Sequence, residues 1–545
     1  MDELWYKDAI FYAVDVESFQ DGNGDGTGDF KGLASRLDYL GEMGVTCLWL
    51  LPFYATPNRD NGYDVKDYYS IDSRLGSLQD FSDFVAAARE RNIRILIDLI
   101  VHHTSDEHPW FQAGTMDTTS KFHDFYVWRE EKPQQETENI FPGEESSVWS
   151  YEKRAGAYYH HKFYSFEPDL NVANPEVQEE IKSIIEFWLA FGIDGFRVDA
   201  ATHLLSGKGT PGTSVKRPAA FLKSLRKTAT KKSASTILLA EADVTPDKLG
   251  FYYGRGDRIN MLFNFLLDNY IFLALAREEA EHVAEFLERP LPHYRCQWAN
   301  FLRNLDELDL ERLSEKERQD VFKRFAPKAE MRIFNRGIRR RLAPMLNGDR
   351  KHLEMVNSLL FTMPGSPLIV YGDEIGMGED LDLPGRTSVR TPMQWDSSTN
   401  GGFSSAPTSK LFRKPVTTGP FGIKQVNVEA QLHDDNSLLN WMKRLILIRK
   451  NCKEIGWGTP KVVKASLPQV LVHSYDWEGN GLVFAHNLSS KPCRFSITSR
   501  KFHPRQFVDI FCDTDYEPTA EHTTEIYLEG YGYRWFRVNE LKKKQ

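Results

Sequence analysis

The chain has 545 residues, more than one compact core usually holds, and it has room for a barrel of roughly 250 residues with smaller modules. Hydrophobic residues make up 41% and charged residues 27%, as in ordinary globular proteins. The net charge is −9, so we expect no nucleic-acid partner. The sequence has no run of about 18 apolar residues, so we expect no membrane span either.

Two features bear on where the protein resides. The first residues, MDELWYKDAIFYAV, have no basic start followed by an apolar stretch, so no secretory signal is predicted. The cysteines are odd in number and scattered, which favours free thiols in a reducing cytoplasm; they are Cys47, Cys296, Cys452, Cys493 and Cys512. A secreted form that has lost its signal stays open, and so does a homo-oligomer.

Short β-type runs alternate with longer helical patterns over most of the chain. Several runs are almost continuously apolar, as expected of parallel strands that are covered on both faces. Eight strand–helix units predict an α/β fold, the (β/α)₈ TIM barrel. The predicted strands are residues 9–16, 45–51, 93–100, 193–200, 236–240, 261–263, 298–302 and 367–371.

The segment between the first two strands shows the helical pattern. FKGLASRLDYLGEMG places apolar residues at helical spacing, namely Phe30, Leu33, Leu37, Leu40 and Met43. We therefore expect one helix, stopped by a left-handed residue at Gly44.

Two segments depart from the alternation of strands and helices that predicts the barrel. Residues 104–172 are rich in Trp, Tyr, His and Pro and too long for a βα loop, so we expect a small inserted domain over the barrel mouth. Residues 456–545 contain VLVHSYDWEGNGLVFAHNLS, two alternating strands around a turn, and predict a C-terminal antiparallel β-sandwich. The barrel then occupies residues 1–103 and 173–455.

Polar residues follow the ends of the predicted strands. The third strand leads from Asp98 to His102 and His103, the fourth carries Arg197 and Asp199, and the fifth ends at Glu241. RNLDE, which contains Asp306, follows the seventh strand. Because functional residues of this barrel gather at the C-terminal strand ends, the set predicts one active site rather than scattered capping groups.

The carboxylates favour glycosyl transfer. A retaining mechanism needs two carboxyl groups about 5 Å apart, and adjacent strands lie about 4.8 Å apart. Asp199 and Glu241 end adjacent strands, and Arg197 lies on the same face as Asp199, where its charge favours an ionised nucleophile. Glu241 follows the apolar run ILLA, which favours a protonated acid/base. Asp306 is suited to gripping sugar hydroxyls.

These segments resemble a known family. GFRVDA, LLAEA and the RNxDE segment look like the catalytic signatures of the α-amylase superfamily (glycoside hydrolase family 13), DLIVHH like its first conserved region, and EPDLN like its loop signature. HTSDEHPWFQ, RIFNRGIRRRLAPML, VYGDEIGMG and VRTPMQW are most similar to the trehalose synthase and oligo-α-glucosidase branch. The resemblance runs through almost the whole chain.

The resemblance implies further substrate-binding residues. Asp64 and Tyr63 of GYDV should line the sugar pocket, and His103 should bind the primary hydroxyl of the sugar. Arg390 of VRTPMQW should reach toward Asp64 or the sugar, although an Asp64–Arg390 pair could equally be a structural bridge.

The first predicted strand is followed by a loop of alternating acidic residues and glycines. Asp21, Asn23, Asp25 and Asp29 stand at alternate positions, where their oxygens can converge on one hard cation. An EF-hand would need Glu at the twelfth position, which is Gly32 here. The resemblance implies a structural calcium ion that also uses the backbone oxygen of Thr27; a plain turn is the alternative.

Three substitutions depart from the family pattern. Leu305 stands where the family has a histidine that holds ring hydroxyls, so we expect an altered substrate preference. His102 precedes His103 in place of the usual asparagine, and Asp15 and Glu17 stand where the trehalose synthase branch commonly has His and Arg. The loop after the fourth strand, HLLSGKGTPGTSVKRPAAF, also differs from that branch.

Three functions remain open from the sequence. The first is trehalose synthase-like glucosyl transfer on a small α-glucoside, interconverting maltose and trehalose. The second is an α-glucosidase that hydrolyses short α-gluco-oligosaccharides or sucrose-like disaccharides, and the third is a non-catalytic carbohydrate-binding descendant. The first two share every catalytic residue and differ in how tightly the inserted domain seals the pocket.

Overall fold

A computed structural model of the chain contains the closed barrel that the sequence predicts. It describes residues 3–134, 136, 139–208, 210, 212–289, 291–498, 505–519 and 525–540. Every strand of the barrel is parallel to both of its neighbours. In chain order the strands are β1 (Phe11–Val14), β2 (Cys47–Leu50), β5 (Arg94–Leu99), β9 (Gly195–Val198), β10 (Ile237–Ala240), β11 (Met261–Phe263), β12 (Gln297–Asn300) and β16 (Ser366–Val370).

Local sequence signals explain the helices that cover the barrel. The helix α4 (Leu78–Glu90) begins with a capping box between Ser77 and Asp80, and α6 (Pro175–Ala190) begins after the Asn174 cap with Pro175 in its first turn. Trp188 of α6 is fully buried against Phe53 and Phe81. These contacts fix the outer helical layer, and the loops above it carry the functional residues.

The helix expected over residues 30–43 is two helices. They are α2 (Phe30–Ser35) and α3 (Leu37–Met43), separated at Arg36. The Arg36 guanidinium turns away, donates to Gln20 Oε1 at 2.7 Å and lies 4.0 Å from the centre of the Trp395 ring. Gly44 ends α3 with the predicted left-handed backbone, φ 91°. The apolar spacing is thus helical on both sides of Arg36, whose own backbone, with φ −105° and ψ 5°, departs from the helix.

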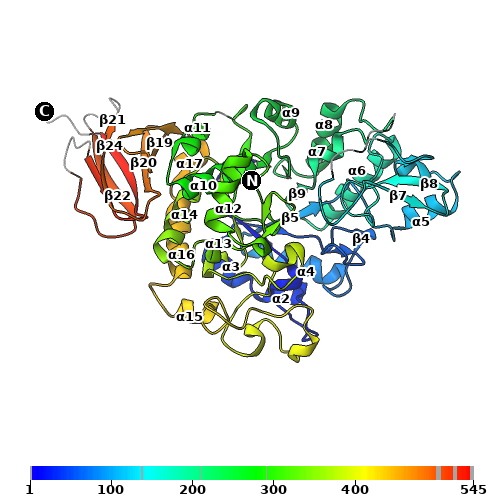
Figure 1. Cartoon of the computed structure of the whole chain (residues 1–545), viewed down its shortest axis with the longest axis horizontal. Coiled ribbons are helices and arrows are strands. Elements are labelled where there is room, and N and C mark those ends of the chain that lie inside the picture. The colour runs from blue at the N-terminus through cyan, green and yellow to red at the C-terminus, as the bar shows by residue number, and fades with distance from the viewer. Residues whose placement is uncertain are drawn as a thin grey trace.

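The segment 104–172 carries its own small sheet. It contains α5 (Pro109–Met116) and the antiparallel strands β6 (Trp128–Arg129), β8 (Ala157–His160) and β7 (Trp149–Glu152), in that spatial order. Figure 1 shows this part on the opposite side of the barrel from the C-terminal sheets. Phe163 of this segment lines the cavity at the mouth of the barrel, and the Phe141 ring packs against it.

The end of the chain forms two packed antiparallel sheets. One has the order β17 (Lys461–Val462), β19 (Val470–Trp477), β20 (Asn480–Asn487), β24 (Tyr533–Glu540) and β22 (Arg505–Cys512). The other has the order β18 (Lys464–Ala465), β21 (Cys493–Thr498) and β23 (Glu525–Leu528). Glu478 and Gly479, both with positive φ, make the tight turn of the predicted hairpin.

Two further observations concern the described part of the chain. None of its helices is long and apolar enough to cross a membrane. All five cysteines are unpaired.

Candidate active site

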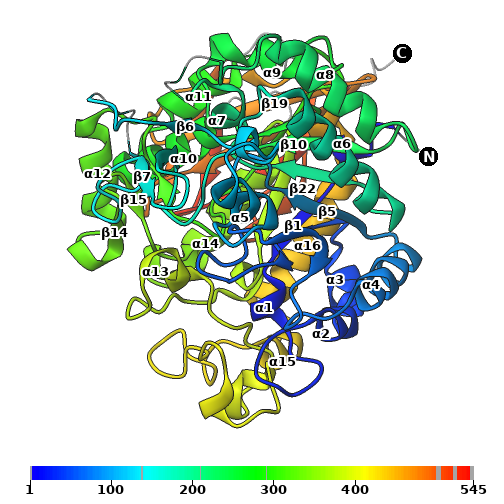
Figure 2. The ribbon, with the colours of Figure 1, turned by 90° about the vertical axis from the view of Figure 1, so that its right-hand side faces the viewer.

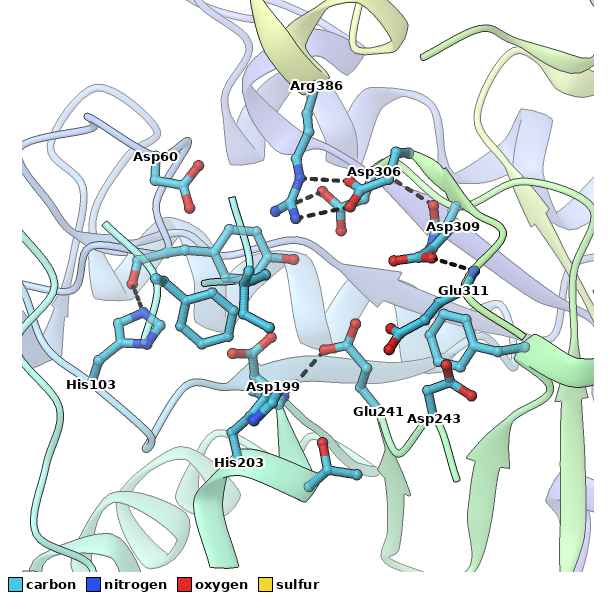
Figure 3. Close-up of a pocket in the computed structure, with 18 of the residues that line it drawn as sticks. Asp60, His103, Asp199, His203, Glu241, Asp243, Asp306, Asp309, Glu311 and Arg386 are labelled. Carbon is cyan, nitrogen blue, oxygen red and sulfur yellow. Dashed lines mark hydrogen bonds and ion pairs between the residues drawn. The ribbon is translucent and has the colours of Figure 1, made fainter. Parts of the chain in front are cut away.

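A cavity opens at the carboxyl ends of the barrel strands, beneath the inserted segment. It measures about 940 Å³, its open mouth included. Figure 3 shows Asp199 and Glu241 side by side in it, with Asp306 and Arg386 facing them. Its lining is dominated by charged side chains, comprising Asp60, Glu167, Arg197, Asp199, Glu241, Asp243, Asp306, Glu307, Asp309, Glu311, Arg336 and Arg386, together with Tyr63, His103, Ile140, Phe163, Ala200, Thr202, His203, Phe265 and Asn304.

One buried guanidinium joins the two central carboxylates. Arg197 Nη1 donates to Asp199 Oδ1 at 2.5 Å, and Arg197 Nη2 donates to Glu241 Oε2 at 2.8 Å. Because the two donors belong to one planar group, the carboxyl groups are held close together, as a retaining mechanism requires. The adjacent pairing of β9 and β10 and the shared face of Arg197 and Asp199 place them there, as the sequence predicts.

The backbone after β9 also orients Glu241. Ala200 has the left-handed conformation, φ 43° and ψ 42°, which costs a non-glycine residue about 1–2 kcal/mol. In this conformation its N–H donates to Glu241 Oε2 at 3.1 Å. The strained turn at the end of the strand thus supplies a second donor to the same carboxylate oxygen.

The surroundings shift the pKa values of Glu241, Asp199 and Asp306 differently. Burial raises the pKa of Glu241 to about 7, with Arg197 opposing the rise and Asp199 adding to it. Burial also raises the pKa of Asp199, against the opposing charge of Arg197. A carboxyl group with a pKa near 7 can donate and accept protons at neutral pH, which suits Glu241 to acid/base work.

Asp306 lies across the cavity and stays ionised. Burial opposes this, but Arg386 and Arg390 outweigh it, so the pKa of Asp306 is lowered. Arg390 Nη2 donates to Asp306 Oδ1 at 2.6 Å, and Arg386 Nη1 lies 3.6 Å from the same oxygen. An ionised carboxylate facing the pair can accept hydrogen bonds from sugar hydroxyls.

Asp98 lies behind Asp199 and Glu241 and is the third carboxyl group that Arg197 contacts. Arg197 Nη1 donates to Asp98 Oδ1 at 2.9 Å, and the Trp49 indole donates to the same oxygen at 3.3 Å. Burial raises the pKa of Asp98 to about 7 although Arg197 lowers it. Arg197 therefore faces three carboxyl groups, and their combined charge raises its own pKa despite burial.

Tyr63 and His103 line the cavity, as the resemblance implies. His103 Nε2 lies 3.1 Å from the Tyr63 carbonyl oxygen, and Tyr63 OH lies 3.5 Å from Arg197 Nη1. Burial lowers the pKa of His103 to about 4, so its imidazole is neutral at physiological pH. A neutral imidazole in this place can hydrogen-bond a sugar without adding charge.

The expectation that Asp64 lines the cavity is wrong in this structure, whereas the reach of Arg390 toward a bound sugar stays a prediction. Asp64 is fully buried behind the cavity, where its carboxylate accepts from the backbone N–H groups of Arg59 and Asp60 at 3.0 and 3.1 Å. Arg390 reaches Asp306 and the Leu305 carbonyl oxygen rather than Asp64. Backbone N–H groups of the turn before GYDV donate to the Asp64 oxygens, and Asp60 of the same turn lines the cavity.

Leu305 also lies elsewhere than expected. Its side chain is buried in the hydrophobic core with 1% exposed, and its neighbours Asn304 and Asp306 line the cavity. The backbone turns the middle residue inward, where an apolar side chain is suited to the surroundings. A change of substrate preference through direct contact with Leu305 is therefore not supported.

The other two departures have local partners. His102 contacts Lys208 Nζ, and Lys208 Nζ also donates to the His203 carbonyl oxygen at 3.0 Å and lies 3.2 Å from Asp169 Oδ2. Glu17 accepts from Asn58 at 3.0 Å and pairs with Arg74. The Asp15 carboxylate accepts from the N–H of Glu17 and caps α1 (Val16–Phe19). These residues support the loops around the cavity.

Comparison with known proteins agrees with this geometry. A model of the α-amylase catalytic domain matches residues 14–458, and a model of the sucrose hydrolase-like C-terminal domain matches residues 479–537.

The chain belongs to the α-amylase family.

Its relatives within the family include trehalose synthases. The chain is 39% identical to the trehalose synthase of Pimelobacter sp. (strain R48), over 98% of this chain and 96% of the relative. It is also 39% identical to the trehalose synthase/amylase of Mycolicibacterium smegmatis, over 99% and 93%. The oligo-1,6-glucosidase of Parageobacillus thermoglucosidasius is 29% identical, over 99% and 100%.

Solved structures share the fold. The trehalulose synthase of Pseudomonas mesoacidophila MX-45 superimposes with a TM-score of 0.78 at 23% identity, over 98% of this chain and 99% of that one. The trehalose-6-phosphate hydrolase of Bacillus licheniformis gives a TM-score of 0.79 at 23% identity, over 98% and 100%. At this identity the likeness concerns the fold alone.

The α-amylase-family cavity contains charged residues that sequence reasoning missed. Asp60 and Glu167 belong to RDNGYDV and EPDLN, so those motifs carried a signal for them. Arg336 belongs to RIFNRGIRRRLAPML, which likewise carried a signal, whereas Arg386 lies in the short helix η6 (Gly385–Val389), where no periodicity marks the side chains that face inward. Asp243, whose Oδ1 accepts from Arg312 at 2.5 Å, lies two residues beyond Glu241.

The acidic loop after the first strand lies outside this cavity. Asp21 accepts from the backbone N–H groups of Gly24 and Gly26 and from Ser404 Oγ, at 2.6, 2.9 and 2.6 Å. Figure 2 shows this blue loop beside the yellow segment that contains Ser404. The exposed Asn23 donates to Asp25 Oδ2 at 3.0 Å. Among the described residues, no group of three or more His, Cys, Asp or Glu is arranged to hold a metal ion.

The acidity of the carboxyl pair predicts a bell-shaped pH profile. Glu241 must carry its proton in the first step, so kcat/KM should fall as the pH rises through about 7, and it should fall at low pH when Asp199 is protonated. The measurement is kcat/KM against pH on an α-glucoside. An α-glucosyl fluoride, whose leaving group needs no proton, should lose the basic limb. A disaccharide profile that stays flat up to about pH 9 would contradict this role of Glu241.

Proposed function

We propose that the protein is a retaining enzyme that acts on small α-glucosides and transfers the glucosyl unit within its pocket, interconverting maltose and trehalose. The Arg197-linked pair of Asp199 and Glu241 is the observation that carries the reaction type. The extended identity with trehalose synthases supports the choice of substrate. A non-catalytic descendant would have no reason to keep both carboxylates on one buried guanidinium.

In the first step, Asp199 attacks the anomeric carbon of the bound glucosyl unit. The bond from that carbon to the bridging oxygen breaks, and Glu241 gives its proton to the leaving oxygen. Arg197 keeps Asp199 in its nucleophilic, ionised form, since the two atoms in contact are 2.5 Å apart. The product of the step is a glucosyl ester of Asp199 and a free glucose.

In the second step, Glu241 acts as a base. It takes a proton from the anomeric hydroxyl of the retained glucose, whose oxygen attacks the anomeric carbon of the glucosyl ester. The bond from that carbon to the Asp199 oxygen breaks, which restores the Asp199 carboxylate. Two inversions give net retention, so the product is an α-glucoside. Asp306 accepts hydrogen bonds from ring hydroxyls in both steps. If water attacks instead, the product is glucose, which is the α-glucosidase outcome.

Product analysis tests this assignment. Maltose should give trehalose, and trehalose should give maltose, with a smaller amount of glucose, as measured by chromatography. Asp199→Ala and Glu241→Gln should each lower turnover by several orders of magnitude while the melting temperature stays near that of the wild type. Glucose as the sole product would favour the α-glucosidase. Wild-type rates in either variant would remove the assigned residue from the mechanism.

We also propose that the acidic loop binds a structural calcium ion. The donor set fits this ion, since Asp21, Asn23, Asp25 and Asp29 bring hard oxygen atoms to alternate positions of one tight loop. All four side chains accept bonds from backbone N–H groups of the loop, and Asn23 and Asp25 are exposed whereas Asp21 and Asp29 are buried. The backbone oxygen of Thr27 would add a ligand. The ion would stabilise the fold and take no part in the chemistry.

Chelation separates calcium binding from the hydrogen bonds of the loop. A ligand that binds only the folded state raises its stability, so a chelator should lower the melting temperature and added calcium should restore it. Asp25→Ala, which changes an exposed side chain, should remove the response to calcium. Asp83→Ala, at an exposed position on α4, is the control. An identical melting curve with and without chelator would refute the proposal.

We infer a cytoplasmic location from the thiols. Cys47, Cys296 and Cys452 are buried and unpaired, and burial raises the pKa of each. Such thiols suit a reducing compartment.

A further inference from the structure

We propose that Asp243, held in place by Arg312, binds the second sugar of the disaccharide and determines the specificity for it. The inference rests on the proposed function and deepens it, because no motif and no reaction step assigns a role to these two residues. Asp243 follows β10 and lines the cavity, whereas Arg312 follows β13 (Leu308–Asp309). The Asp243 side chain is 28% exposed and that of Arg312 is 24% exposed.

The reaction requires the second sugar to lie next to Glu241. Asp199 attacks the anomeric carbon of the glucosyl unit, and Glu241 protonates the oxygen that bridges the two sugars. The second sugar begins at that oxygen, so it extends past Glu241 and away from Asp199. Figure 3 shows Asp243 on this side, together with Asp309 and Glu311, and all three line the cavity.

Arg312 holds Asp243 at two points. Its Nε donates to Asp243 Oδ1 at 2.5 Å, and its Nη2 donates to the Asp243 carbonyl oxygen at 2.6 Å. Because both donors belong to one planar group, they fix the side chain of Asp243 relative to its own backbone. The second carboxylate oxygen, Oδ2, has no hydrogen-bond partner among the residues that the structure describes. It is therefore available to a ligand.

The surroundings make Asp243 an acceptor at neutral pH. Burial raises the pKa of Asp243 to about 6, the Arg312 guanidinium opposes this rise, and the charges of Asp309 and Glu311 add to it. Most of the group is ionised at pH 7, and an ionised carboxylate only accepts hydrogen bonds. The hydroxyl groups of a sugar are the matching donors.

The neighbouring carboxylates lack this combination of features. Asp309 already uses both of its oxygens, since Arg336 Nε donates to Oδ2 and the N–H of Glu311 donates to Oδ1, each at 2.8 Å. Glu311 is exposed at the rim. Asp243 has both a fixed position and an unbonded oxygen. A fixed polar group of this kind selects a ligand by its hydroxyl, because a ligand without that hydroxyl leaves the group unpaired.

Substrates with and without a second sugar test the proposal. Asp243→Asn keeps the shape but loses the charge, so kcat/KM on maltose and on trehalose should fall roughly 10- to 100-fold. The value for α-glucosyl fluoride, which has no second sugar, should stay near that of the wild type. The control is Asp257→Asn, which alters the exposed Lys223–Asp257 pair (2.8 Å) outside the cavity and should change neither value.

A double variant tests whether Arg312 acts through Asp243. Arg312→Gln should show the same contrast between disaccharides and fluoride, with a smaller loss, because it only releases Asp243 from its position. If the two residues act as one unit, the double variant should lose no more than Asp243→Asn alone. Additive losses would contradict the positioning role of Arg312.

The outcomes separate this inference from the proposed function. A wild type that hydrolyses both disaccharides without interconverting them contradicts the proposed function, but the ratio of kcat/KM between disaccharide and fluoride still tests Asp243. An equal loss on all three substrates in Asp243→Asn would indicate a structural defect and overturn the assignment. No loss on any of them would overturn it as well.

Discussion

The active site depends on a single buried cation. Arg197 contacts Asp98, Asp199 and Glu241 through the ends of one guanidinium, and the side chains of Asp98 and Asp199 are buried, with 0% and 8% exposed. A buried carboxylate without a partner would take up a proton, because desolvation penalises the charged form. With the cation between them, Asp199 can be ionised while Glu241 keeps a pKa near 7. This arrangement therefore suits Asp199 to act as the nucleophile and Glu241 to act as the acid.

The strand pairing of the barrel fixes the relative positions of Arg197 and its carboxyl partners. The pairing of β5, β9 and β10 aligns Asp98 with Arg197 and sets Glu241 just beyond the end of its strand. The left-handed turn at Ala200 then brings a backbone N–H to Glu241. A strained turn thus borders the cavity at Ala200, beside the carboxyl pair. Strain at this place favours a functional role over a purely stabilising one.

The sequence predicts the positions of those site residues that lie at the ends of regular strands. Asp199 and Glu241 could be placed together because strand order and side-chain alternation follow from the pattern of apolar runs. The roles of Asp64, Arg390 and Leu305 could not, because each depends on the path of an irregular loop. The turn before Asp64 captures its carboxylate, and the loop after β12 turns Leu305 into the core. Arg386 could not be placed either, since its partners Glu307 and Phe141 are distant in sequence and meet it only in the folded chain.

Direct detection of the glucosyl ester tests the account most directly. Glu241→Gln, treated with α-glucosyl fluoride, should form the ester, because the fluoride leaves without a proton, and should hydrolyse it slowly, because the base is missing. Mass spectrometry of the digested protein should then find one glucosyl unit on the peptide that contains Asp199. The absence of such an adduct, together with proton NMR showing a β-anomer as the first product of the wild type, would contradict the double displacement.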